Sequence, residues 1–292
     1  MKKNKRAWFA VPYVGWMALF VVIPILIMLV YSLTVTVTTE SGESMHFTWE
    51  NFTGMGLYVS VFTRSFYLAV IATVVCLLIG YPVSYLMARE GAAFQRVAMA
   101  LIMLPMWMNF LLRTYSWMSI LENNGLLNQL FRNLGILSLY NRLTGSDLQY
   151  FQMIRTSGAV VLGMVYNYLP FMILPIYSVL SKMDGSLIDA AQDLGANSAG
   201  VFRRVILPLS LPGVLSGVTM VFVPSVSTFA ISRLLGGGTQ MMLGDLIENQ
   251  FLGGAYNPHL GAAISMVMMV IVVACMVIMN HFGDGEEQAV ML

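Results

Sequence analysis

The chain has 292 residues, of which 58% are hydrophobic and only 10% are charged, and its formal net charge is +1. Soluble domains carry about 25% charged residues, so this chain has too little charge to cover a water-facing surface, and its mean hydropathy of +0.76 agrees. The composition excludes a soluble enzyme, and the near-zero net charge provides no long-range field that would attract nucleic acid.

Six stretches of the chain are long and apolar enough to cross a bilayer, which takes about 20 residues in a helix. These stretches are residues 8–33, 66–88, 97–121, 157–180, 209–232 and 260–280. Basic residues precede the first stretch, but its apolar run is much longer than the core of a signal peptide. We therefore expect a retained first helix and an all-α integral membrane protein, with a bundle of about six transmembrane helices in a single domain over residues 1–292.

The distribution of lysine and arginine predicts how the bundle is oriented. Cytoplasmic loops of membrane proteins carry an excess of these residues. The N-terminal segment and the short loops after the second and fourth spans are basic, so they are expected in the cytoplasm. An even number of spans then returns the C-terminus to the cytoplasm and leaves the longer connections 34–65 and 122–156 outside.

The patterns of cysteine, histidine and glycine argue against disulfide, metal and nucleotide sites. Cys76 and Cys275 lie in apolar stretches, and the three histidines have no partner at ligand spacing. The chain also lacks the phosphate loop G-x-x-x-x-G-K-S/T, because the glycine run 236–238 is followed by Thr239 and not by lysine. The sequence therefore predicts that this chain binds no metal, no ATP and no other cofactor.

Residues 182–208, between the fourth and fifth spans, form the most informative segment. Ser186 and Asp189 have the spacing of a capping box, and Gly195 is a natural helix stop. The side chains expected on one face of this helix are Leu187, Ala190, Ala191 and Leu194. A second short helix is expected to begin near Asn197 or Ser198, to carry Phe202 and to run toward Pro208. Helices this short are marginal alone, so the apolar face either packs on its own bundle or meets a partner, and periodicity favours neither.

This segment resembles the cytoplasmic loop of ABC-importer permeases, whose pattern is E-A-A-x3-G-x9-I-x-L-P. The matching residues are Asp189, Ala190, Ala191, Gly195, Val205, Leu207 and Pro208. Aspartate replaces the usual glutamate, and valine replaces isoleucine. The resemblance implies a type I ABC-importer permease fold, in which the loop docks into a groove on a separate ATPase subunit and transmits the motion of that subunit.

Further stretches resemble the B-type membrane subunits of spermidine/putrescine importers. They are residues 80–82 with Arg89, residues 104–117, residues 166–177 and residues 261–265. The resemblance implies that the chain forms half of a path for polyamines in the cell (inner) membrane. It also implies a second homologous permease, a cytoplasmic ATPase dimer that binds ATP and Mg, and an extracytoplasmic substrate-binding protein.

Other functions remain open at this point. Permeases for sulfate, ferric ion, thiamine or phosphonate share the general scaffold. A stand-alone secondary transporter would usually show internal repeats, which the sequence does not, and a membrane enzyme would need clustered catalytic groups.

Aromatic and acidic side chains are the candidates for a polycation path, because aromatic faces hold cations and intramembrane acids can match their charge. The candidates are Tyr115, Trp117, Glu122, Tyr166, Tyr168, Phe229, Asp245 and Glu248. Each also has a structural interpretation, as an interface anchor, a packing residue or a solvated helix end. Arg113 would repel a polyamine unless it lies at the outer interface or pairs with an acid such as Glu122. An unpaired Arg113 would favour an anionic substrate.

The fourth and fifth spans contain prolines, which remove backbone donors and kink helices. They are Pro170, Pro175, Pro212 and Pro224. Because these two spans flank the loop 182–208, a push on the loop is expected to reach kinked helices directly.

Overall fold

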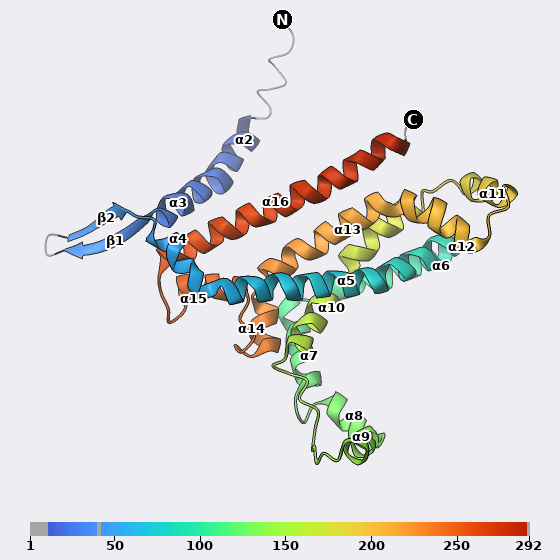
Figure 1. Cartoon of the computed structure of the whole chain (residues 1–292), viewed down its shortest axis with the longest axis horizontal. Helices are drawn as coiled ribbons and strands as arrows, with labels where there is room; N and C mark the ends of the chain where they lie inside the picture. Colours follow the sequence, from blue (N-terminus) through green and yellow to red (C-terminus); the bar gives the residue numbers. More distant parts are fainter. Residues whose placement is uncertain (1–10, 40–41, 291–292) are drawn as a thin grey trace, which may run out of the picture. The chain divides into compact units, whose positions relative to one another are not determined.

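A computed structural model describes residues 11–39 and 42–290 of the chain (Figure 1). The basic N-terminal residues on which the predicted orientation depends lie outside this part. The chain divides into two compact units, residues 1–60 with 246–273 and residues 61–245 with 274–292. The structure is almost entirely helical, and the one departure from the all-α expectation among the described residues is a short β-hairpin.

The described part of the first unit starts with a helical run made of α2 (Val11–Met17), the π-helical turn η1 (Ala18–Val22) and α3 (Ile23–Ser32). The hairpin follows, with β1 (Thr34–Thr39) antiparallel to β2 (Gly42–Phe47) and Thr34 opposite Phe47. Next come α4 (Glu50–Gly54) and the 3₁₀ turn η2 (Met55–Tyr58). The unit also contains parts of α15 (Leu243–Leu252) and α16 (Pro258–Val290).

His259, at the start of α16, holds three parts of this unit together. Its Nδ1 donates to the carbonyl of Tyr31 at 3.0 Å, and its Nε2 lies 2.8 Å from the hydroxyl of Thr36. The imidazole also stacks on the ring of Tyr31, with centroids 5.1 Å apart. The histidine is buried, so these bonds satisfy both ring nitrogens without water.

The second unit contains the remaining helices. They are α5 (Val59–Arg89), α6 (Ala92–Met103), the 3₁₀ turn η3 (Leu104–Trp107), α7 (Phe110–Leu121), α8 (Leu126–Asn133), α9 (Ile136–Thr144), α10 (Ser157–Leu180), α11 (Gly185–Asp193), α12 (Ser198–Val201), the π turn η4 (Phe202–Ile206), α13 (Leu207–Ser227) and α14 (Ala230–Gly236). The helices α10 and α13 form the most extensive contact of this unit.

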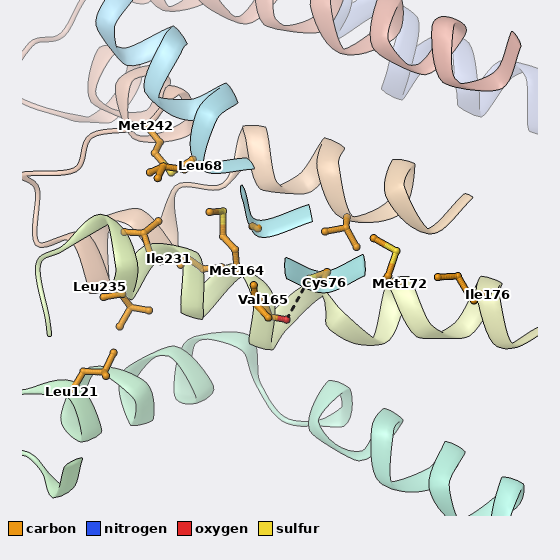
Figure 2. Packing of buried hydrophobic residues seen from close by; sticks show 14 of the residues in the cluster. Leu68, Cys76, Leu121, Met164, Val165, Met172, Ile176, Ile231, Leu235 and Met242 are labelled. Carbon is orange, nitrogen blue, oxygen red and sulfur yellow. Dashed lines mark hydrogen bonds between the residues drawn. The ribbon is translucent and has the colours of Figure 1, made fainter. Parts of the chain in front are cut away.

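Glycines allow α10 and α13 to approach closely. A Cβ added at Gly213 would lie 2.9 Å from the carbonyl oxygen of Pro175, and one at Gly217 would lie 2.8 Å from the sulfur of Met172. Small residues at a crossing let helix backbones pack directly, which is how membrane helices associate when lipid is as apolar as the helix surface. Figure 2 shows the core around this crossing, with Met164, Met172 and Ile176 inside it.

Five helical runs are long and apolar enough to span a membrane, and a bent pair makes a sixth. The five runs are Val11–Ser32, Glu50–Arg89, Ser157–Leu180, Ser198–Ser227 and Pro258–Met279. This confirms the predicted number of spans. The helical runs at the second and fifth spans begin well before the predicted starts, at Glu50 and Ser198, because helical turns with polar residues precede the apolar stretches.

The third span, predicted as one helix over 97–121, is broken instead. The segments Ala92–Trp107 and Phe110–Asn133 meet at 91°. Pro105 cannot donate a backbone hydrogen bond, and the Asn109 side chain accepts bonds from the amides of Leu111 and Leu112 and so caps a new helix. A proline followed by an asparagine cap ends one helix and begins another, although the whole stretch is apolar.

The fifth span is also shorter at its end than predicted. The helix α13 continues through Pro212 and Pro224 but ends at Ser227, and Thr228 is extended with ψ at 139°. A Cβ on Gly244 would lie 2.5 Å from the carbonyl oxygen of Ser227, so only glycine fits against this break. Residues predicted as the end of the span form the separate helix α14.

Candidate functional site

The segment between α10 and α13 folds into the predicted pair of short helices. The side chain of Asp184 caps α11, since its Oδ1 accepts the amide of Ser186 at 3.0 Å. The expected cap at Ser186 is therefore wrong by two residues. The predicted stop at Gly195 is confirmed, because Gly195 has φ of +84° and its amide donates to the carbonyl of Gln192 at 2.8 Å.

The second short helix begins where the sequence predicted. Asn197 accepts the amide of Gly200 at 2.8 Å and caps α12. The chain then continues without interruption through η4 into α13 at Leu207. The π turn ends at Ile206, two residues before Pro208, where the helix must accommodate a residue without an amide hydrogen. As a result, α12, η4 and α13 form one continuous helical run, which we call the lever, and the α11–α12 loop lies at one end of it (Figure 1).

The two sides of α11 have different environments. Ile188 and Ala191 pack against the hydrophobic core. Ala191 therefore lies at the buried edge of the predicted apolar face, whose other members, Leu187, Ala190 and Leu194, are exposed. Leu187 is 46% exposed and Leu194 is 90% exposed. The helix therefore packs on its own bundle with one side and leaves an apolar face open on the other, which combines the two alternatives that periodicity had left undecided.

Three aromatic rings pack together where the lever meets α5. They belong to Tyr81, Tyr85 and Phe202, and we call them the aromatic clamp. The ring of Phe202 on η4 meets Tyr81 edge-on at 5.9 Å and Tyr85 edge-on at 5.6 Å, both on α5. Such edge-to-face pairs contribute about 0.5–1.5 kcal/mol each beyond the burial of their surface. The Tyr81 hydroxyl lies 2.9 Å from that of Ser210 on α13. The clamp thus joins the end of α5 to the lever that carries the loop.

Arg89 closes the clamp from the end of α5. Its guanidinium carbon lies 4.5 Å from the centroid of the Tyr85 ring, a cation–π distance. A cavity of about 140 Å³ lies beside this pair and is lined by Leu180, Ile188 and Ile206 among others. The cavity lies among residues of α5, α10 and α11.

No sequence pattern predicted a role for the aromatic clamp. Residues 80–82 and Arg89 entered only through resemblance, and Phe202 only as part of a short helix. The spacing of Tyr81, Tyr85 and Arg89 puts them on one helix face, four residues apart. That stripe at the end of a span, next to the loop, is the signal that could have indicated the clamp.

Two of the substrate-path candidates are brought together by the structure. Trp117 on α7 and Tyr166 on α10 meet edge-on at 5.4 Å. Tyr168 donates its hydroxyl to the carbonyl of Pro224 at 3.4 Å, close to the break that ends α13. These side chains lie at the contact of three helices of the second unit.

The other candidates lie on separate elements. Tyr115 and Phe229 are each about half exposed, and Glu122 is exposed directly after α7. Asp245 is buried, and its Oδ2 accepts the amide of Met242 at 3.0 Å. Glu248 is half-buried on α15. Asp245 therefore has a structural use at the start of α15, where it caps the helix.

Arg113 is buried on α7, with 8% of its surface exposed. Neither Nε nor Nη1 has a hydrogen-bond partner within the described part of the chain. Pairing with Glu122 is therefore not seen for these two nitrogens, and a position of Arg113 at the outer interface stays a prediction. Arg113 lies on the same face of α7 as Phe110, Trp117 and Leu121, which pack against the core. Because this face is turned toward the core, the guanidinium is buried with them.

The cap at Asp184 makes the loop sensitive to acid. The amide of Ser186 holds the pKa of the Asp184 carboxyl below its usual range. Because the folded pKa is lowered, the cap stabilises α11 above the unfolded pKa, and the stabilisation is lost as the pH falls through the folded value. We expect amide hydrogen exchange in α11, corrected for its intrinsic pH dependence, to show less protection as the pH falls below about 4.

The matched variants for this prediction are Asp184→Asn and Asp193→Asn. Asparagine still caps a helix but cannot titrate, so Asp184→Asn should remove the change in protection with pH. Asp193 is exposed at the other end of α11, and its replacement should leave the change in place. An unchanged response in Asp184→Asn would contradict the assignment of the cap.

Comparison with known proteins now defines the class of this chain. Residues 80–285 match the family described as binding-protein-dependent transport system inner membrane component. The chain belongs to this family, and it is therefore a multi-pass permease component of an inner-membrane ABC transport system and not an enzyme.

Two relatives resemble the chain over nearly its full length. It is 37% identical to the spermidine/putrescine transport system permease protein PotB of Haemophilus influenzae, over 88% of this chain and 86% of that protein. It is 35% identical to PotB of Escherichia coli strain K12, over 89% of this chain and 91% of that protein.

Among solved structures, a chain of a bacterial ABC transporter involved in the import of the acidic polysaccharide alginate has the same fold. The TM-score is 0.72 at 15% sequence identity, and the match covers 97% of both chains. This likeness confirms the type I importer permease architecture expected from the loop motif.

Proposed function

We propose that this chain is one of two permease subunits of an ATP-driven importer of polyamines such as spermidine and putrescine. The observation that carries the proposal is the identity of 35–37% with PotB proteins over nearly the whole of both chains. In this proposal an extracytoplasmic binding protein delivers the substrate, and a second homologous permease supplies the other half of the path. A cytoplasmic ATPase dimer binds ATP and Mg and hydrolyses the nucleotide.

The docking element for the ATPase is the exposed side of the α11–α12 loop. The residues assigned to coupling are Asp189, Ala190, Ala191, Gly195, Leu207 and Pro208. Leu194 and Leu187 present open apolar surface on α11, and such surface on a short helix suits a groove on a partner. This assignment puts the loop and both termini in the cytoplasm.

Coupling follows from the contacts of the loop. A push on α11 reaches the core through Ile188 and Ala191, and a push on α12 moves the lever. Since Phe202 is held between Tyr81 and Tyr85, movement of the lever must carry the end of α5 with it. Interfaces packed like this one switch between discrete arrangements and do not deform smoothly.

The polyamine path is proposed at the boundary between the two permeases. A side chain that lines such a path is exposed when one chain is taken alone, which favours Tyr115 and Phe229 and the acid Glu122. Each aromatic face can contribute about 0.5–2 kcal/mol to holding an ammonium group. The side chains packed behind these exposed residues are Trp117, Tyr166 and Tyr168, and they support the path without lining it. Two further candidates for the path are Asp245 and Glu248 on α15.

The experiment that tests the proposal is ATPase activity of the complete purified importer in lipid vesicles. We expect spermidine or putrescine, presented with the binding protein, to stimulate hydrolysis, and sulfate to have no effect. If ATPase activity is the same with and without polyamine but rises with another solute, polyamine is not the substrate, and the assignment to an ABC importer still holds. Failure to bind any ATPase would overturn both.

Leu194→Glu tests the docking surface directly. The side chain is 90% exposed, so the substitution should leave the fold intact while placing a charge in the interface with the ATPase. We expect the ATPase to co-purify poorly and polyamine stimulation to be lost. Gln192→Glu is the matched control, because it adds the same charge on another side of α11. If Leu194→Glu retains a full complement of ATPase, this face is not the docking surface.

The buried Arg113 favours a second candidate, a permease for an anionic solute such as sulfate. A guanidinium without an acceptor among the described residues would attract an anion and repel a polycation. Arg113→Gln distinguishes the two substrates. The polyamine importer should keep its response to spermidine in this variant, whereas an anion importer should lose its response to sulfate.

A further inference from the structure

The connection between α7 and α10 contains a helical hairpin that the transport mechanism does not use. It consists of α8 and α9, which contact each other, and α8 also contacts α7. The loop after α9 leads to Ser157, where α10 begins, and α10 ends at Leu180 beside the α11–α12 loop. The hairpin therefore lies on the side of the membrane opposite that loop.

The hairpin is internally well packed. The ring of Phe151 meets Phe131 of α8 at 5.8 Å and Tyr140 of α9 at 5.2 Å, edge-on in both cases. Asn128 is buried and bonds both the amide and the carbonyl of Phe151, at 2.9 and 3.0 Å. These contacts fix which sides of α8 and α9 face inward.

The outward sides are apolar. The side chains that form this apolar stripe are Leu126, Leu130, Leu134, Ile136, Leu139 and Leu143. They are between 40% and 77% exposed, and on each helix they repeat at helical spacing. Six large exposed aliphatic side chains on two short, adjacent helices are unfavourable in water.

The stripe follows directly on a helix that belongs to a candidate membrane span. Leu111 and Leu112 on α7 are exposed and belong to the third predicted span. Only residues 122–125 separate α7 from α8. If the exposed leucines of α7 face lipid, as expected for a spanning helix, the exposed leucines of α8 follow at the level where the bilayer meets water.

The charges of the hairpin also suit a lipid surface. Between residues 126 and 144 the only ionisable side chains of Lys, Arg, Asp or Glu are Arg132 and Arg142, so the segment is purely cationic. Arg132 lines an open concavity of about 380 Å³ together with Ser138, Asn141 and Gln149, on the polar side of the hairpin. A polar hollow with a cation, next to an apolar row, matches the phosphate and acyl chain of an anionic phospholipid.

We propose that α8 and α9 form an interfacial anchor. The apolar stripe lies among the lipid chains of the leaflet opposite the α11–α12 loop, and Arg132 and Arg142 contact the phosphates of anionic headgroups. The anchor holds the broken third span, which α7 completes, at a fixed depth in the membrane.

Fluorescence quenching in the complete importer tests the first half of this proposal. Cys275 is replaced by alanine, and Cys76 is kept because it is buried. A fluorophore is attached either to Leu130→Cys on the stripe or to Gln129→Cys, the exposed neighbour on the polar side. We expect the label at 130 to be quenched by nitroxides on lipid chains near the headgroup, and the label at 129 by iodide in the water.

Two results would overturn lipid contact. Quenching of the label at 130 by iodide would place the stripe in water. Protection of that label from both quenchers would show that a protein covers it, either the second permease or the binding protein.

Lipid composition tests the second half. Vesicles of phosphatidylglycerol are compared with vesicles of phosphatidylcholine that have the same acyl chains. Phosphatidylglycerol should increase lipid quenching of the label at 130 several-fold, and the double variant Arg132→Gln, Arg142→Gln should abolish that increase. Equal quenching in both lipids would reject the contact with anionic headgroups.

Discussion

Replacing Phe202 with alanine is expected to uncouple ATP hydrolysis from the substrate. The substitution removes the ring that Tyr81 and Tyr85 hold between them. Coupling free energies between sites are typically about 1–3 kcal/mol, so stimulation of the ATPase by polyamine should fall about tenfold. Basal hydrolysis should persist, because the nucleotide sites lie on another chain in the proposed assembly.

The measurement is the ratio of stimulated to basal ATPase activity in vesicles, together with uptake of labelled spermidine. Phe202→Tyr keeps the ring and should retain most of the stimulation. Phe94→Ala removes an exposed phenylalanine from α6 and should behave as the parent protein. If Phe202→Ala keeps the full ratio of activities, the aromatic clamp does not transmit the motion of the loop.

Gly217→Leu is expected to prevent the second unit from folding. A Cβ at this position already lies 2.8 Å from the sulfur and 3.1 Å from the carbonyl oxygen of Met172. The backbone cannot move aside as a side chain can, so α10 and α13 must separate. Overpacking costs about 1–3 kcal/mol in a core that can adjust, and a collision with backbone should cost more.

The readout is the yield of monodisperse protein after extraction in detergent, with the thermal midpoint of whatever remains. Gly91→Leu is the control, because no heavy atom lies within 4 Å of a Cβ added there. Gly213→Leu should repeat the defect, since its Cβ would meet the carbonyl of Pro175. Parental yield of Gly217→Leu would mean that α10 and α13 do not cross in this way.

The spans could be predicted from the sequence because length and apolarity alone decide whether a helix can cross a bilayer. Their breaks could not, since an apolar stretch looks the same whether it is straight or bent. The bend of 91° depends on Pro105 and the Asn109 cap, both visible in the sequence but outweighed by the leucines around them. The end of α13 at Ser227 has no such signal, because it depends on Gly244 from a later segment.

The coupling loop could be predicted more fully than the path. The caps and stops of its short helices depend on residues close by in the sequence, so they can be predicted from it. The cap of α11 was nevertheless predicted at Ser186, because Asp184, two residues earlier, is an equally good capping residue. Which side of α11 is buried depends on α5 and α10, so the sequence could not show that Ala191 is the member of the predicted face that packs inward. The burial of Arg113 likewise depends on its neighbours in space, and the same holds for the aromatic clamp.

The bonds of His259 have a consequence for the order in which the chain is made. This histidine opens the last span, and the carbonyl it holds belongs to Tyr31, 228 residues earlier. A ribosome releases the first helix long before the histidine exists. That helix has no buried residues within its most apolar window even in the finished chain. The opening span must therefore wait in the lipid, or beside an insertion factor, until synthesis is nearly complete.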